Sequence, residues 1–185
     1  MVLSLNLQQF GEEATGTGIT VRIQRNALEI RVLYVVTGNL QGLRLPAPAD
    51  NPGYRDHLWQ HTCFELFLAR LNRPEYVEMN FSPSGHQALF LFPDYRGARK
   101  AEMAPPAEPG HLLRGPASLS FSVTLAAQPL EDLLGGPIDL AGPAAVLFAS
   151  NGRTGYWASG HGAKPDFHDR HYWQSCPLDE QEQAR

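Results

Sequence analysis

Two short segments of the chain combine aromatic rings with groups that can form hydrogen bonds. In the first segment, residues 59–68, Trp59, His61 and Glu65 share one set of alternate positions. In the second, residues 76–81, Glu78 and Asn80 do so. A pyranose has apolar C–H faces that stack on rings, and its hydroxyls need donors and acceptors. This pattern favours recognition of a sugar or a similar polar ligand. A solvated sheet face with the same residue types is the alternative.

A further segment, residues 151–173, is rich in the same side chains. It holds three of the seven histidines and two of the three tryptophans of the chain. If it meets the first two segments in space, we expect Trp59 and Trp157 to flank the ligand. The predicted ligand-binding residues are Trp59, His61, Glu65, Glu78, Asn80, Asn151, Arg153, Trp157, His161 and His168.

Metal binding and catalysis have weaker signals. His168 and His171 have the spacing of ligands on a helix, but Pro165 and the strand-like context disfavour a helix there. No Gly-x-Ser-x-Gly, glycine-rich phosphate loop or His-Glu-x-x-His motif is present. We therefore predict no catalytic residue and no metal site, and we lean away from an enzyme. Acid–base chemistry by His57, His168 and Asp166 stays open as an alternative.

The elements that must position these side chains are short strands. Alternation of apolar and polar residues, aromatic content and turn residues predict about eight strands. They cover 19–25, 28–36, 58–69, 76–81, 87–92, 119–125, 144–150 and 156–159. Residues 129–134 predict one short helix, with a proline in its first turn and glycines after it.

The order of these elements has no strand–helix–strand alternation, which predicts an all-β fold. We expect an antiparallel β-sandwich of the jelly-roll or immunoglobulin-like kind, with one short helix. Residues 1–178 would form a single domain, and residues 179–185 a polar C-terminal tail. The long loop 37–54 and the proline-rich connection 93–117 complete the chain.

Each strand has two faces, which divide the side chains into two sets. One face of residues 59–68 carries Phe64, Leu66 and Leu68. An equally apolar face of residues 76–81 carries Val77, Met79 and Phe81. These faces should meet the sandwich core. The opposite faces carry the carboxylates, the amide and the aromatic rings, so a ligand would bind there.

Composition limits the partners of the protein. The 185 residues carry a net charge of −4, which argues against nucleic acid as a partner. No apolar stretch approaches the roughly 18 residues of a membrane span, and the first ten residues do not resemble a secretory signal. We expect a cytoplasmic protein without membrane contact, in which Cys63 and Cys176 are reduced. Its partner would be a small molecule, and the sequence does not indicate an oligomeric state.

Several of these segments resemble the DOMON-like superfamily and the related family-nine carbohydrate-binding modules. The similarity covers most of residues 19–173 and rests on short motifs. They are Cys63-Phe-Glu-Leu-Phe-Leu68, Tyr76-Val-Glu-Met-Asn-Phe-Ser-Pro-Ser-Gly85, Phe121–Leu125 with Leu130–Leu134, Tyr156-Trp157 and Pro165-Asp-Phe-His168. The resemblance implies a β-sandwich that binds a sugar or, in other branches, haem.

Haem or a metal ion is therefore an alternative ligand, although we predict no cofactor. The resemblance implies axial Met, His or Lys ligands for haem, but Met79 should point into the core and Met103 lies in the proline-rich connection. His61, His161, His168 and His171 are the candidate ligands in that case.

Overall fold

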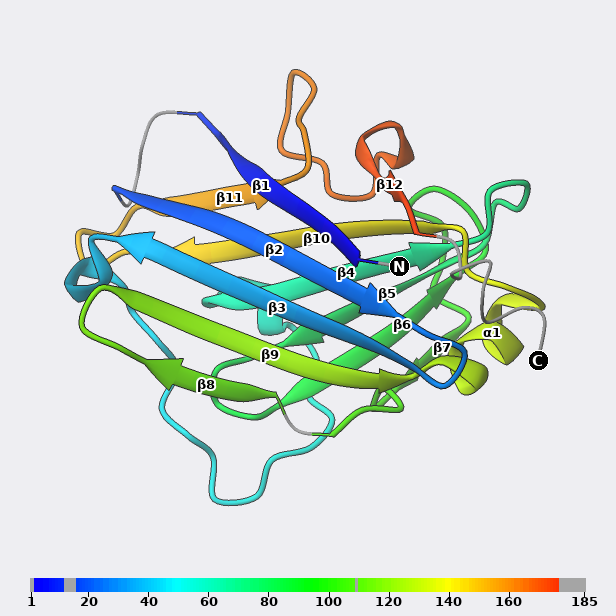
Figure 1. The fold of residues 1–185 in the computed structure, drawn as a ribbon, viewed down its shortest axis with the longest axis horizontal. Helices are drawn as coiled ribbons and strands as arrows, with labels where there is room; N and C mark the ends of the chain where they lie inside the picture. The colour runs from blue at the N-terminus through cyan, green and yellow to red at the C-terminus, as the bar shows by residue number, and fades with distance from the viewer. Residues whose placement is uncertain (1, 12–15, 109, 177–185) are drawn as a thin grey trace.

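The computed structural model describes residues 2–11, 16–108 and 110–176, which form two antiparallel sheets packed face to face (Figure 1). The first sheet has the order β1-β2-β3-β9-β8, and the second has the order β7-β6-β5-β4-β10-β11. Strands of the first sheet are β1 (Val2–Phe10), β2 (Thr17–Arg25), β3 (Glu29–Gly38), β9 (Ser118–Ala126) and β8 (His111–Arg114). Strands of the second are β7 (Ala101–Met103), β6 (Gln87–Phe92), β5 (Tyr76–Phe81), β4 (Cys63–Ala69), β10 (Leu140–Phe148) and β11 (Thr154–Ala158), with β12 (Gln174–Ser175) beside the start of β10.

Strand β1 joins the two sheets into one continuous hydrogen-bonded surface. Its residues 2–7 pair with β2, whereas Gln8 to Phe10 pair with β11. The predicted antiparallel β-sandwich with one short helix is confirmed. The jelly-roll assignment stays a prediction. The predicted tail, residues 179–185, lies outside the described residues.

The core lies between the sheets and follows the predicted strand faces. Phe64, Leu66 and Leu68 of β4 and Met79 of β5 are all buried in it. The rings of Phe64 and Phe121 stack across the two sheets with 4.7 Å between their centroids. This confirms the division of β4 and β5 into an inner apolar face and an outer mixed face.

The single described α-helix, α1 (Ala127–Leu134), closes one end of the sandwich. Leu130 and Leu134 enter the core, and Gly135 ends the helix in the left-handed conformation with a φ of 69°. The helix begins two residues before the predicted start. None of the described helices has the length and apolarity needed to cross a bilayer.

Four strands and three 3₁₀ helices are not predicted from the sequence. Strands β1, β7, β8 and β12 lie in the N-terminal segment, in the proline-rich connection and near the C-terminus. Two of the 3₁₀ helices are η1 (Leu40–Gly42) and η3 (Arg170–Tyr172). Most important for the site, Leu58–Gln60 form a third, η2, so β4 begins only at Cys63. The prediction of a strand over 58–69 is therefore wrong at its start, and Trp59 and His61 do not belong to the strand face.

The packing between the sheets leads to a first prediction. Phe64→Ala removes a ring that is fully buried against Tyr34 and Phe121, so we expect a loss of about 3–5 kcal/mol in the free energy of unfolding, measured in urea. Leu28→Ala is the control because Leu28 is 81% exposed, and it should change stability by less than about 0.5 kcal/mol. Equal losses in the two variants would contradict this account of the core.

Candidate ligand-binding site

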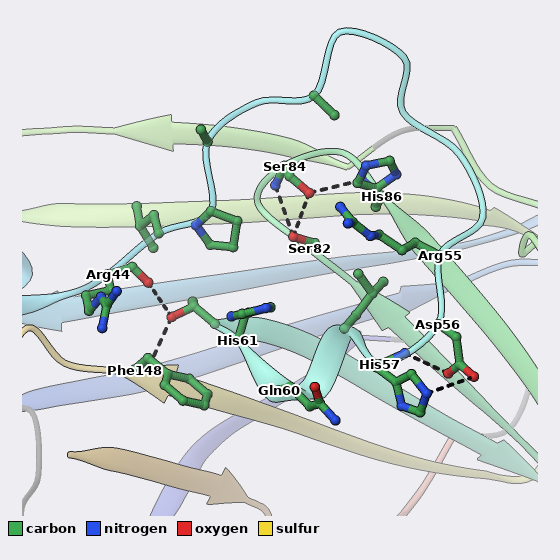
Figure 2. A pocket seen from close by; sticks show the side chains of 16 residues that line it. Arg44, Arg55, Asp56, His57, Gln60, His61, Ser82, Ser84, His86 and Phe148 are labelled. Atoms are coloured by element: carbon green, nitrogen blue, oxygen red, sulfur yellow. Dashed lines mark hydrogen bonds and ion pairs between the residues drawn. The ribbon is translucent and has the colours of Figure 1, made fainter. Parts of the chain in front are cut away.

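Two cavities lie on either side of the 3₁₀ helix η2. The larger, of about 830 Å³, is bounded by the loop that runs from Arg44 to Gln60, and we call it the loop cavity (Figure 2). The smaller, of about 360 Å³, lies on the outer face of the second sheet, and we call it the outer-face cavity. Leu58 and Gln60 line the loop cavity, whereas Trp59 lines the outer-face cavity.

Strand alternation explains the floor of the outer-face cavity. Glu65 of β4, Glu78 of β5, Val146 of β10 and Tyr156 of β11 all point away from the core and line it. Glu65 lies opposite Asn80 in the strand register, so the two glutamates are diagonal neighbours on one face. Both are buried, with exposed fractions of 3% for Glu65 and 6% for Glu78.

The walls of this cavity come from segments outside the strands. Trp59 comes from η2, and Phe167 and His168 come from the segment before η3. Arg96 and Arg99 follow β6 and also line the cavity. Three segments outside the strands therefore complete the site above the strand floor.

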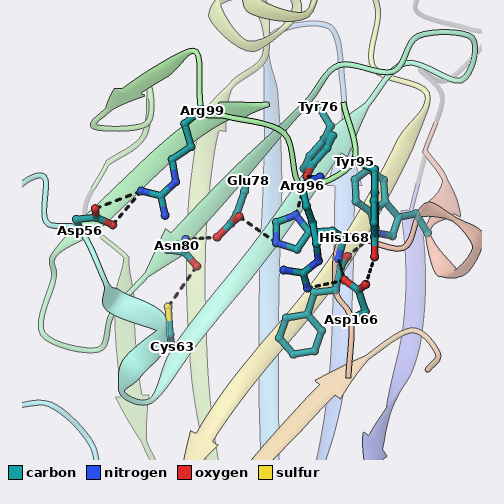
Figure 3. Close-up of polar contacts among 12 residues, drawn as sticks. Asp56, Cys63, Tyr76, Glu78, Asn80, Tyr95, Arg96, Arg99, Asp166 and His168 are labelled. Atoms are coloured by element: carbon teal, nitrogen blue, oxygen red, sulfur yellow. Dashed lines mark hydrogen bonds and ion pairs between the residues drawn. The ribbon is translucent and has the colours of Figure 1, made fainter. Parts of the chain in front are cut away.

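Ion pairs fix the two arginines in place (Figure 3). Arg96 Nη2 lies 2.7 Å from Asp166 Oδ1, and Arg99 Nη1 lies 3.2 Å from Asp56 Oδ2. The Arg99 guanidinium also lies over the ring of Phe90, 3.9 Å from its centroid, and 5.1 Å from the ring centroid of Trp59. Because cations are attracted to ring faces, Arg99 holds Trp59 as part of the cavity wall.

A chain of polar contacts leads from Tyr76 to Asn80 through His168 and Glu78 (Figure 3). Tyr76 Oη lies 2.6 Å from His168 Nδ1 and accepts a hydrogen bond from the backbone N–H of Arg96. In the tautomer in which the tyrosine hydroxyl donates to Nδ1, the imidazole proton is on Nε2. That nitrogen faces Glu78 Oε2 at 3.6 Å, and Asn80 Nδ2 donates to Glu78 Oε1 at 2.7 Å.

Burial controls the protonation of this group of residues. It lowers the pKa of His168 from 6.5 to about 4, with a smaller contribution from the positive charge of Arg96, so the imidazole is neutral near pH 7. Burial also raises the pKa of Glu65 well above its ordinary value, and the neighbouring Glu78 raises it further. The pKa of Glu78 is raised by burial too, although the hydrogen bond from Asn80 opposes the shift.

One oxygen of the floor has no partner. Among the described residues, nothing forms a hydrogen bond with the buried Oε1 of Glu65. An unsatisfied buried polar atom costs about 1–3 kcal/mol. A ligand hydroxyl that reaches the floor of the cavity would remove this cost.

Four of the predicted ligand-binding residues line the outer-face cavity: Trp59, Glu65, Glu78 and His168. Asn80 is fully buried and supports Glu78 from the same strand. His61 lines the loop cavity instead, because the chain turns through η2 before it.

The structure corrects the expected position of Trp157. Trp157 is 5% exposed and belongs to the core between the sheets, so it does not flank a ligand with Trp59. Its neighbour Tyr156 points to the outer face and lines the cavity. The two adjacent rings of β11 alternate, and the sequence alone did not show which one faces outward.

Three other predicted residues lie outside the lining of both cavities. Asn151 and Arg153 form the exposed turn between β10 and β11, where Asn151 Oδ1 accepts from the backbone N–H of Arg153. His161 Nε2 bonds to the backbone oxygen of Gln8 at 2.8 Å, and its ring packs on Phe10. These side chains stabilise local structure, and the prediction that they converge with Trp59 is wrong.

The sequence analysis missed the two arginines and two rings of the site. Arg96 and Arg99 follow β6 in the proline-rich connection, and Phe92 and Tyr156 were not considered as ligand contacts. Arg96 has a φ of 53°, a conformation that is rare for residues other than glycine and that no sequence pattern indicated.

The candidates for metal, haem and acid–base chemistry do not form a common centre. No group of three or more His, Cys, Asp or Glu side chains in the described ranges could hold a metal ion. His61 and His168 line different cavities, and the side chain of His171 is 95% exposed. Asp166 is engaged by Arg96 and Tyr95, and His57 lines the loop cavity.

Comparison with known proteins supports the fold. No protein-family model and no curated protein sequence matches the chain. A solved structure of a candidate carbohydrate-binding protein from Bacteroides uniformis ATCC 8492 has a TM-score of 0.64 and 14% identity, over 97% of this chain and 86% of that one.

Two further similar structures are family 9 carbohydrate-binding modules from Caldicellulosiruptor kristjanssonii. The complex with cellotriose has a TM-score of 0.47 and 13% identity, over 84% of this chain and 72% of that one. The complex with glucose has a TM-score of 0.48 and 12% identity, over 91% and 80%. At 14% identity, the similarity to the Bacteroides uniformis protein concerns the fold, and the DOMON-like resemblance stays a prediction.

The buried imidazole gives a prediction about pH. The pKa of His168 is lower in the folded protein than in the unfolded chain, so between pH 6.5 and 4 the unfolded chain binds the proton first. We expect this to lower the free energy of unfolding as pH falls through that window, by up to roughly 3 kcal/mol. Urea unfolding at a series of pH values measures it.

His168→Gln is the reference variant because an amide oxygen accepts from Tyr76 but does not titrate. Glu65 and Glu78 have raised pKa values and act in the opposite direction, since the folded protein takes up their protons first as pH falls. The difference between wild type and variant isolates His168. A difference that stays constant from pH 6.5 to 4 would show that the imidazole is not buried neutral.

Proposed function

We propose that this protein binds a carbohydrate, or a polar small molecule of similar shape, in the outer-face cavity. The observation that carries the proposal is the unpartnered Oε1 of Glu65 at the floor of a cavity with aromatic walls. Rings provide the stacking surface that the apolar face of a sugar needs, and the carboxyl groups and arginines provide partners for its hydroxyls.

The chemistry of the lining suits a hydroxyl-rich ligand. Trp59, Tyr156 and Phe167 supply rings, while Glu65 and Glu78 supply carboxyl groups to the same lining. A carboxylate only accepts hydrogen bonds, whereas a protonated carboxyl group also donates one. Since burial raises both pKa values, the pair can offer a donor as well as acceptors, as a sugar hydroxyl requires.

The size of the cavity limits the ligand. About 360 Å³ lies at the lower end of the range of about 300–1,000 Å³ for small-molecule sites. We therefore infer that one sugar ring, or the end of a longer chain, occupies it. The fold shared with the candidate carbohydrate-binding protein of Bacteroides uniformis supports the same class of ligand.

Calorimetry with a panel of mono- and disaccharides tests the proposal. For the sugar that binds, Trp59→Ala should weaken binding by about tenfold or more, because it removes a stacking ring from the wall. Trp59→Phe keeps a ring and should lose less. The proposal fails if no sugar in the panel binds, or if Trp59→Ala binds as tightly as wild type.

The two adjacent aromatic residues of β11 provide a separate prediction. Tyr156 lines the cavity and is 37% exposed, so Tyr156→Ala should weaken sugar binding with little loss of stability. Trp157 is part of the core, so Trp157→Phe should lower the free energy of unfolding by about 1–3 kcal/mol and leave sugar affinity unchanged. Calorimetry measures the affinities, and urea unfolding measures the stabilities. The opposite result would mean that Trp157, and not Tyr156, contacts the sugar.

A further inference from the structure

The loop cavity is larger than the outer-face cavity, and the proposed function does not use it. It lies where β4 begins and where β5 and β10 end, with Thr62, Ser82 and Phe148 in its lining. The other side is the long loop that precedes η2, from Arg44 onward (Figure 2). A cavity of about 830 Å³ is large enough for an ordinary small-molecule ligand.

The lining of this cavity is rich in hydrogen-bond donors and positive charge. Arg44 and Arg55 stand at different parts of it, and Ser82 and Ser84 add hydroxyl groups to the same lining (Figure 2). The remaining polar lining includes three imidazoles, which are His57, His61 and His86.

The positive charges are not neutralised within the site. In the part of the chain that the structure describes, neither the Arg44 nor the Arg55 guanidinium has an ion-pair partner. Asp56 is the one acidic side chain in the described lining, and it pairs with Arg99, 3.2 Å away. An anion in the loop cavity would therefore meet guanidinium groups that no carboxylate of the described residues already engages.

Hydrogen bonds hold the loop in place over the cavity. Thr62 Oγ1 donates to the backbone oxygen of Arg44 at 2.7 Å and accepts from the backbone N–H of Phe148 at 3.0 Å. The backbone N–H of Ala49 donates to Ser84, and that of Arg55 donates to Gln87. These anchors at both ends, with prolines 46, 48 and 52 between them, keep the cavity formed before a ligand arrives.

The histidine beside this loop is also oriented by it. His86 Nδ1 lies 3.2 Å from the backbone oxygen of Gly53 and donates to it, because a carbonyl oxygen can only accept. This contact fixes the ring against the loop and adds to the anchors that hold the cavity open.

We propose that the loop cavity is a second binding site, for a small organic anion whose charge lies on a phosphate or carboxylate group. Guanidinium groups match the oxygens of both groups with paired hydrogen bonds, and the serine hydroxyls add further donors. The site is separate from the outer-face cavity, since η2 lies between them and turns Trp59 to one side and Gln60 to the other.

Calorimetry of the full chain at low ionic strength tests this proposal with inorganic phosphate, glycerol 3-phosphate, citrate and neutral glycerol. We expect at least one anion to bind and glycerol not to bind. Glycerol 3-phosphate and citrate distinguish a phosphate source from a carboxylate source. Raising the salt to 0.15 M should weaken binding, because exposed charges are then screened over roughly 8 Å.

Variants locate the binding to the cavity. Arg55→Gln and Arg44→Gln should each weaken anion binding by roughly tenfold, the usual effect of losing a hydrogen bond to a charged group. Arg22→Gln is the charge-matched control, because Arg22 is exposed on β2 of the other sheet. The proposal is overturned if none of the three anions binds at millimolar concentration, or if Arg22→Gln weakens binding as much as Arg55→Gln.

The two proposed sites can fail independently. Trp59→Ala should keep anion binding, and Arg55→Gln should keep the binding of a neutral sugar. Loss of anion binding in Trp59→Ala would mean that both ligands share the outer-face cavity, and it would refute a separate anion site.

Discussion

Strands β4 and β5 are buried on both of their faces, and the rest of the site depends on this constraint. Their inner faces enter the core between the sheets, and their outer faces are covered by Trp59, by the segment after β6 and by the segment before η3. A polar side chain on such an outer face loses water and must find partners within the protein. Glu65, Glu78 and Asn80 are in this position.

The partners that these groups find explain the electrostatics of the outer-face cavity. Asn80 and the neutral His168 hold Glu78, whereas one oxygen of Glu65 stays without a partner among the described residues. The arginines above the floor are already paired with Asp56 and Asp166, so they contribute orientation as well as charge. The charged groups of the cavity walls therefore have partners within the protein, and Glu65 Oε1 is the buried atom of the floor that a ligand can reach.

The helix η2 separates this site from the loop cavity and gives the two different chemistry. Trp59 on one side belongs to a cavity with aromatic rings and buried carboxyl groups. On the other side, the loop cavity carries two arginines without acidic partners among the described residues. Three residues of 3₁₀ helix therefore divide a region suited to hydroxyl groups from a region suited to an anion.

The sequence alone determined most of the strands and, for β4 and β5, which face is apolar. Alternation in β4 and β5 placed Phe64 and Met79 in the core and Glu65 and Glu78 on the opposite face, because side chains alternate along any strand. Only the tertiary structure decided what covers that outer face. The contributions of Arg96 and Tyr156, and the burial of Trp157, depend on loop paths and on the packing of β11, which are set by contacts between distant segments. Local pattern does not encode such contacts, because each of them needs a partner far away in the chain.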